Sequence, residues 1–193
     1  MKSALFCIFT TFSICLGAVP DNEGDVVIVN RREWGAIRPK HPPTELETLP
    51  PNYVIITHTA SGICTTKDIC VFHVRNIQEI HTKQYGWNDI GYNFLVGGDG
   101  NVYEGRGWDI EGAHTKAYNK KSLGIAFIGD FTYKSPSQVQ IDAAKRFLEF
   151  GFKQNKLAKG YKLLGSRQVS NTRSPGNKLY EIIQSWEHWS ENP

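Results

Sequence analysis

The stretch from His81 to His114 carries the residue types best suited to hold a polar ligand. It gathers aromatic rings, two imidazoles, a guanidinium and closely spaced glycines, namely His81, Tyr85, Gly86, Trp87, Tyr92, Arg106 and His114. Rings offer stacking surfaces, and a guanidinium offers charge-assisted hydrogen bonds. We therefore interpret the stretch as a binding groove, although each histidine taken alone is more simply a structural residue satisfied by its neighbours.

Hydrophobic periodicity predicts the elements that position these side chains. Residues 92–96 and 102–104 have strand-like patterns around a Gly- and Asp-rich turn, which indicates a hairpin. A period of two then places Tyr92 and Phe94 on the same side of the sheet.

The rest of the chain mixes strands and helices. Apolar runs predict further strands at 26–30, 53–56, 122–128 and 161–164. Spacings of three and four predict helices at 67–85, 139–152 and 179–186. The pattern is typical of an α/β domain with a central sheet covered by helices. Thr57 and His58 follow a buried strand, where open α/β sheets usually place a ligand.

Length and charge limit the class of protein. A chain of 193 residues suits one globular domain, and a net charge of +3 without a basic run argues against nucleic acid as a partner. Residues 1–18 have a positive start, an apolar core and a small-residue exit, as in a secretory signal peptide. The alternative, a membrane anchor, needs about 20 apolar residues. We expect a secreted, extracellular protein in which residues 19–52 form an N-terminal segment of one fold with 53–193.

The predicted signal peptide contains two of the four cysteines, Cys7 and Cys15. Cys64 and Cys70 remain as an even pair in an oxidising compartment, which predicts a disulfide. A metal-binding pair is the alternative, but the spacing is wide and no second pair lies nearby.

Seven stretches of the chain match a known family: residues 32–36, 53–60, 88–96, 103–108, 112–115, 123–129 and 169–176. On these stretches the chain resembles the peptidoglycan recognition proteins, specifically the short secreted kind. The resemblance implies the fold of N-acetylmuramoyl-L-alanine amidases: a single α/β domain with a mixed central sheet, about three helices and a cleft for the muramyl peptide stem.

The family contains zinc amidases and pure receptors, and the metal positions separate them. Amidase members hold zinc with two histidines and a cysteine, where this chain has Thr57, Ser166 and Ser174. Neutral hydroxyls are poor zinc ligands, so we expect no metal, no cofactor and no zinc amidase activity. Tyr92 stands where amidase members keep a catalytic tyrosine. We assign no catalytic residue.

Two other activities stay open. Ser166 and His58 are the minimum for nucleophilic hydrolysis, although the sequence identifies neither a third residue nor an oxyanion hole. A directly bactericidal peptidoglycan binder is the other alternative.

By resemblance, the cleft is lined by His58, His81, Tyr85, Tyr92, His114 and Asn119, with Gly86 and Trp87 at the third residue of the stem. In family members, this Gly-Trp pair together with arginine at the position of Arg106 goes with meso-diaminopimelate rather than lysine. Diaminopimelate has one carboxylate more than lysine, and a cation such as Arg106 would bind this carboxylate.

The sequence therefore predicts a secreted innate-immune receptor for bacterial peptidoglycan and muropeptides, with a preference for diaminopimelate-type fragments. Downstream immune signalling proteins are the other partners that the resemblance implies, and ligand-induced dimerisation stays open.

Overall fold

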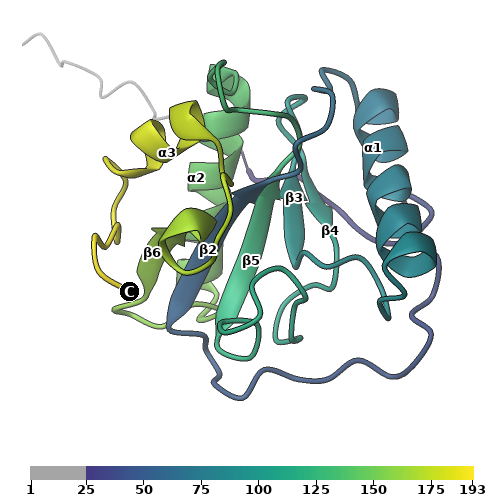
Figure 1. The fold of residues 1–193 in the computed structure, drawn as a ribbon, viewed down its shortest axis with the longest axis horizontal. Helices are drawn as coiled ribbons and strands as arrows, with labels where there is room; N and C mark the ends of the chain where they lie inside the picture. Colours follow the sequence, from purple (N-terminus) through teal and green to yellow (C-terminus); the bar gives the residue numbers. More distant parts are fainter. Residues whose placement is uncertain (1–24) are drawn as a thin grey trace, which may run out of the picture.

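A computed structural model describes residues 25–193, and the predicted signal peptide lies outside the described residues. Six strands form one sheet in the order β1-β4-β3-β5-β2-β6 (Figure 1). Strands β3 and β4 pair antiparallel, and the other neighbours described here pair parallel, so the sheet is mixed as predicted. The strands are β1 (Ile28–Val29), β2 (Tyr53–His58), β3 (Phe94–Val96), β4 (Val102–Glu104), β5 (Ser122–Phe127) and β6 (Lys162–Gly165).

Three α-helices were predicted, and all three form near the expected places. They are α1 (Lys67–Glu79), α2 (Gln138–Lys153) and α3 (Asn177–Ile183). The side chains of Thr66 and Ser137 accept hydrogen bonds from the first turns of α1 and α2, which fixes where these helices begin. The predicted helix at 67–85 is α1 followed by a π-helical turn, η1 (Ile80–Gln84), and a 3₁₀ turn, η2 (Ser166–Gln168), follows β6.

The sheet is covered on both faces. One core joins strand residues such as Val54 and Leu123 to Phe147 of α2 and Leu179 of α3. The second core joins other strand residues, including Leu95 and Tyr103, to Val74 and Ile77 of α1. In Figure 1, α1 accordingly lies on the opposite side of the sheet from α2 and α3. This arrangement leaves the carboxyl ends of the central strands free to carry a site.

The expectation that Tyr92 and Phe94 share a side of the sheet is wrong. Strand β3 begins at Phe94, which packs in the α2 core, whereas Tyr92 packs with the α1 core. Before Phe94 the hairpin pairing is irregular, because the carbonyl of Asn93 accepts the N–H groups of both Gly105 and Gly107. An irregular pairing of this kind breaks the alternation of side chains.

A disulfide joins Cys64 to Cys70, as predicted. It ties the loop after β2 to the first turn of α1. Within residues 25–193, no helix is both long and apolar enough to cross a membrane.

Candidate functional site

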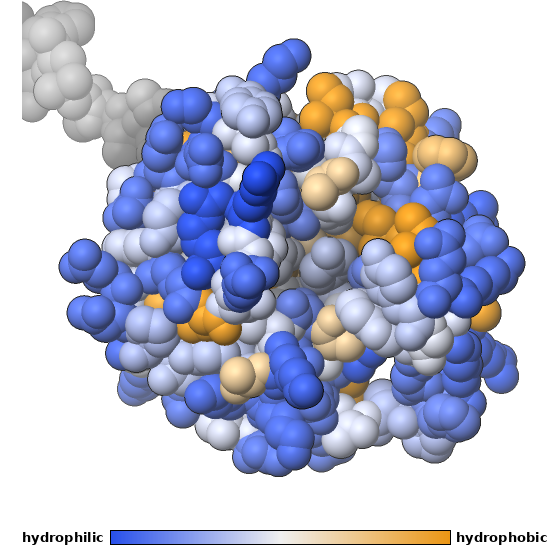
Figure 2. Space-filling view, in the orientation of Figure 1, coloured by the Kyte–Doolittle hydropathy of each residue, from blue (hydrophilic) through white to orange (hydrophobic). Residues whose placement is uncertain are grey.

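A pocket of about 330 Å³ lies at the carboxyl end of β2. We call it the hydroxyl pocket, because most of its lining is Ser and Thr: Thr57, His58, Thr59, Ala60, Tyr92, His114, Ser166, Ser170, Thr172 and Ser174. The parallel register of β2 and β5 sets His58 beside Phe127 at this edge, and η2 closes the other side. The hollow is visible between the α1 side and the η2 side of the molecule (Figure 2).

The imidazole of His58 is neutral and fixed in one tautomer. Its Nδ1 accepts the backbone N–H of Phe131 at 3.2 Å, so the proton of the neutral ring is on Nε2. Burial lowers the pKa of His58; Asp130, with Oδ1 3.7 Å from Nδ1, opposes this effect, and the charge of Arg167 adds to it. At neutral pH this end of the pocket therefore offers hydrogen bonds rather than charge.

His81, Tyr85 and Trp87 form an aromatic cluster beside the pocket. The ring of His81 lies 4.6 Å from that of Trp87 and 5.8 Å from that of Tyr85, centroid to centroid. Nδ1 of His81 accepts the N–H of Gly91 at 2.9 Å, and burial lowers the pKa of His81 to about 4. The Tyr85 ring is exposed, so the cluster presents aromatic surface to solvent around a neutral imidazole.

Tyr92 and His114 connect the aromatic cluster to the hydroxyl pocket. Both line the pocket, and the Tyr92 ring lies 5.5 Å from the ring of His81. Burial raises the pKa of Tyr92 to about 12 and lowers that of His114 to about 3, so both are neutral at pH 7. The His114 ring packs against Gly112 and Gly124, where a Cβ would overlap it, and its buried Nε2 has no partner within residues 25–193. This nitrogen lies against the two glycines, so absence of a Cβ at both positions is what makes room for the ring.

Two predicted residues lie in the loops around these rings. The Oδ1 atom of Asn119 accepts the backbone N–H groups of His114 and Thr115, so this side chain holds the loop that carries His114. Gly86 has φ of +71°, with open space where a Cβ would point. This left-handed conformation favours glycine and sets the turn between the rings of Tyr85 and Trp87.

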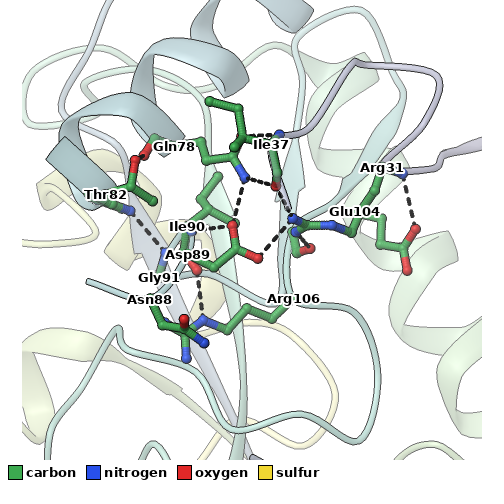
Figure 3. Close-up of polar contacts among 12 residues, drawn as sticks. Arg31, Ile37, Gln78, Thr82, Asn88, Asp89, Ile90, Gly91, Glu104 and Arg106 are labelled. Carbon is green, nitrogen blue, oxygen red and sulfur yellow. Dashed lines mark hydrogen bonds and ion pairs between the residues drawn. The ribbon is translucent and has the colours of Figure 1, made fainter. Parts of the chain in front are cut away.

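Arg106 lies outside the lining of the hydroxyl pocket, in a smaller neighbouring cavity of about 140 Å³. Its Nε donates to the carbonyl of Ile90 at 2.7 Å (Figure 3). Its Nη1 donates to the carbonyl of Glu111 at 2.8 Å. Nη2 donates to no atom within residues 25–193. The guanidinium still reaches the groove electrostatically, because its charge helps to lower the pKa values of His81 and His114.

The loop behind Arg106 is held by a buried carboxylate. Asp89 Oδ2 pairs with Nη2 of Arg31 at 2.8 Å, while Oδ1 accepts the side-chain N–H of Gln78 at 2.6 Å and the N–H of Ile90 at 2.7 Å (Figure 3). We call Arg31, Gln78, Asp89 and Arg106 the Asp89 network. Because Ile90 is held by Asp89 and itself holds Arg106, the network fixes the guanidinium in place.

Known proteins match this chain over most of its length. The family model described as N-acetylmuramoyl-L-alanine amidase matches residues 47–177. Peptidoglycan-recognition protein SD of Drosophila melanogaster is 47% identical over 169 residues, which cover 88% of this chain and 90% of that protein. The chain belongs to the peptidoglycan recognition protein family.

Solved structures of the family superpose closely on this fold. The ectodomain complex of peptidoglycan recognition proteins LCa and LCx with tracheal cytotoxin matches with a TM-score of 0.84 and 48% identity, covering 86% of this chain and 99% of that chain. Peptidoglycan recognition protein LE, also solved with tracheal cytotoxin, matches with a TM-score of 0.83 and 43% identity, covering 85% and 96%. These likenesses agree with the mixed sheet and three helices described above.

The hydroxyl pocket does not fit the zinc of the amidase branch of this family. Each hydroxyl at the three positions that the resemblance assigns to metal ligands has a hydrogen bond within the protein. Thr57 donates to the carbonyl of Ile125, Ser166 donates to the carbonyl of Ser174, and Ser174 Oγ accepts the N–H of His58. No group of three or more His, Cys, Asp or Glu side chains in the described part of the chain is arranged to hold a metal. Zinc favours imidazole, thiolate and carboxylate, so this donor set is wrong for it.

The pocket also lacks the arrangement of a serine hydrolase. Ser166 donates to the carbonyl of Ser174 at 3.0 Å rather than to His58. Asp130 lies near His58 and is the one acidic side chain paired with this imidazole among the described residues. However, Nδ1 of His58 accepts the N–H of Phe131, so it has no proton to donate to the Asp130 carboxylate. A triad needs that proton, because the acid orients the base through it.

Sequence reasoning singled out Arg106 but missed Asp130 and the other members of the Asp89 network, Arg31, Gln78 and Asp89. Arg31 and Asp89 lie 58 positions apart, in segments with no shared periodicity. The one available signal was an acidic residue inside an otherwise aromatic and apolar stretch, since a buried carboxylate requires a partner.

Proposed function

We propose that this protein is a secreted peptidoglycan receptor of innate immunity, that it prefers muramyl peptides with meso-diaminopimelate, and that it does not hydrolyse them. The observation that carries the proposal is the contrast between a neutral pocket at the metal positions and a fixed guanidinium beside the aromatic cluster.

The groove suits a peptide stem. Its imidazoles and phenol are neutral at pH 7, so they bind amides and hydroxyls by hydrogen bonds without a large cost of desolvating charge. The exposed ring of Tyr85 and the half-buried ring of Trp87 add a surface on which the aliphatic part of a stem residue can pack. Binding of this kind needs no metal.

Arg106 supports the preference for diaminopimelate. Two of its nitrogens are held by carbonyls, which orients the third, Nη2, at little entropic cost on binding. A charge-assisted bond to the extra carboxylate is worth about 1.5 to 3 kcal/mol, or roughly 10- to 100-fold in affinity. Relative LE, at 43% identity, was solved with tracheal cytotoxin, described as monomeric diaminopimelic acid-type peptidoglycan.

Calorimetry with two muramyl tripeptides tests the proposal, one carrying diaminopimelate and the other lysine. We expect tighter binding of the first, by roughly 10- to 100-fold, and loss of that preference in Arg106→Ala. Lys159→Ala is the matched control, since it removes an exposed cation near the amino end of β2, at the opposite edge of the sheet. Equal binding would overturn the specificity, and no binding of either peptide would overturn the receptor itself.

A digestion assay tests the absence of hydrolysis. Muropeptides incubated with the protein and added zinc are expected to remain intact by mass spectrometry. Release of free stem peptide, abolished by Ser166→Ala, would favour the serine hydrolase instead; release that depends on zinc would restore the amidase.

A further inference from the structure

A second, basic pocket adjoins the hydroxyl pocket at its far end from Arg106. It has a volume of about 420 Å³ and is lined by Thr132, Tyr133, Arg167, Thr172, Arg173 and Asn177. Thr172 lines both pockets, so the two adjoin at this residue. Figure 2 shows deep blue, strongly hydrophilic side chains gathered over η2 and the loop after it, next to the hollow.

Arg167 is held rigidly in this basic pocket. Its Nη1 donates to Asn177 Oδ1 at 3.0 Å, its Nη2 donates to the carbonyl of Arg173, and its guanidinium lies 4.7 Å from the ring centroid of Tyr180. Its Nε is buried without a partner in the described part of the chain. Nη1 and Nη2 each keep a second N–H, so a guanidinium fixed in this way can still bind an oxyanion in the pocket.

The other two large side chains are unengaged. The Arg173 guanidinium has no hydrogen bond or ion pair within residues 25–193. The Tyr133 ring is 83% exposed and contacts no other ring among the described residues. No carboxylate is among the residues that line the pocket, and Asp130, two positions before Thr132, accepts the N–H and hydroxyl of Thr132. Two cations and a free aromatic face remain for a ligand.

The order of the groove indicates which part of a muropeptide reaches this pocket. The aromatic cluster and Arg106 lie at one end, Tyr92 and His114 follow, then the metal positions, and then Arg167 and Arg173. The family model is described as N-acetylmuramoyl-L-alanine amidase, a name that specifies the bond between N-acetylmuramic acid and L-alanine. By the resemblance, Thr57, Ser166 and Ser174 stand at the positions that would face this bond. With the third stem residue near Arg106, the sugar lies beyond the metal positions.

We propose that the basic pocket binds a phosphate carried by the muramyl sugar, with Arg167 and Arg173 as its ligands and Tyr133 stacked on the sugar face. This proposal rests on the proposed function, because the stem peptide must occupy the groove. The unmodified muramyl sugar is neutral once its lactyl carboxylate is amide-linked, so two arginines read an added anion rather than the sugar alone. The phosphate can sit at the 6-hydroxyl, as in a wall polymer linkage, or at the anomeric oxygen, as in a nucleotide-linked precursor.

Calorimetry with three probes tests the proposal: a diaminopimelate muramyl tripeptide, the same compound with a 6-phosphate, and the uridine-diphosphate-linked form. We expect about tenfold tighter binding of at least one phosphorylated probe than of the first, with the gain shrinking as salt is raised. The phosphorylated probe that binds more tightly identifies the position of the phosphate on the sugar. Arg173→Ala should remove the gain and leave binding of the unphosphorylated probe unchanged, whereas the control Lys159→Ala should keep both.

The outcomes separate this proposal from the receptor itself. Binding of the unphosphorylated probe with no gain in either arm, or a gain that survives Arg173→Ala, would overturn the phosphate site alone. If no probe binds, the receptor function fails. Arg167→Lys gives a second check, because it keeps the positive charge but removes the paired N–H donors of the guanidinium. We expect a smaller gain in affinity from the phosphate and an unchanged melting temperature.

Discussion

The two ends of the groove, the hydroxyl pocket and the Asp89 network, differ in the charge of their side chains. At the hydroxyl pocket, the three metal positions hold neutral hydroxyls that bond to the protein itself. At the Asp89 network, a buried carboxylate and two guanidinia are held in a fixed arrangement. The hydroxyls at one end are neutral, whereas the other end holds charged groups. The comparison teaches that the two ends are built from separate groups of side chains, and the proposed function assigns the reading of the ligand to the charged end.

The largest expected change comes from restoring the metal ligands. The triple variant Thr57→His, Ser166→His, Ser174→Cys should retain one zinc per chain after dialysis, because it rebuilds a three-ligand site of the required donors. Metal analysis by plasma mass spectrometry measures this. The single variant Thr57→His is the control and should retain none. A triple variant without zinc would mean that the pocket differs from a metal site in more than these three side chains.

Removing the carboxylate of the Asp89 network should lower the stability of the protein substantially. Asp89→Ala leaves Arg31 as an unpaired, partly buried cation and two N–H donors without their acceptor, so the free energy of unfolding should fall by about 3 to 5 kcal/mol. Urea denaturation measures the loss. Glu47→Ala removes one partner of an exposed pair with Lys120 and should change little. Equal effects of the two variants would show that the Asp89 network does not hold this loop.

The neutral histidines predict a dependence on acid. The folded-state pKa of His81 is about 4, below its ordinary 6.5, so the unfolded chain binds more protons between these values. The free energy of unfolding should therefore be at its full value above pH 6.5 and decrease as pH falls toward 4, by about 3 kcal/mol from His81. His81→Asn keeps an acceptor for the Gly91 N–H without titrating, and its stability should decrease less steeply over this range. An unchanged slope would contradict burial of a neutral ring.

The smallest expected change concerns the turn beside Trp87. Gly86→Ala meets no atom but must adopt φ near +71°, which should cost about 1 kcal/mol in stability. Gly160→Ala is the matched control: it also has open space, its φ lies outside the left-handed range, and it should cost nothing. Thermal unfolding of both separates backbone strain from loss of volume. Equal melting temperatures of the two variants would mean that residue 86 does not adopt a left-handed conformation that disfavours alanine.

The sequence predicted the fold where local patterns decide structure. The apolar run at 53–56 became β2, and the three- and four-residue spacing at 139–152 became α2. Prediction was poorer where long-range contacts decide. The side of Tyr92 depends on the double acceptor at Asn93, and the π-helical turn that carries His81 has no distinct periodicity.

For the site, residue types could be predicted but their connections could not. The family resemblance placed Arg106 near the groove. No local sequence pattern showed that Arg106 donates to the Ile90 carbonyl or that Asp89 accepts the N–H of Ile90. Those bonds join segments that meet only after folding. The role of each cleft residue in binding therefore stays a prediction for the calorimetry described above.

Native mass spectrometry of the purified protein with a diaminopimelate muramyl tripeptide and added zinc tests the central claim most directly. The account predicts one species whose mass is the protein plus the intact muropeptide, with no zinc. A species with bound zinc, or with only the sugar or the stem peptide attached, would contradict the separation of reading from cutting.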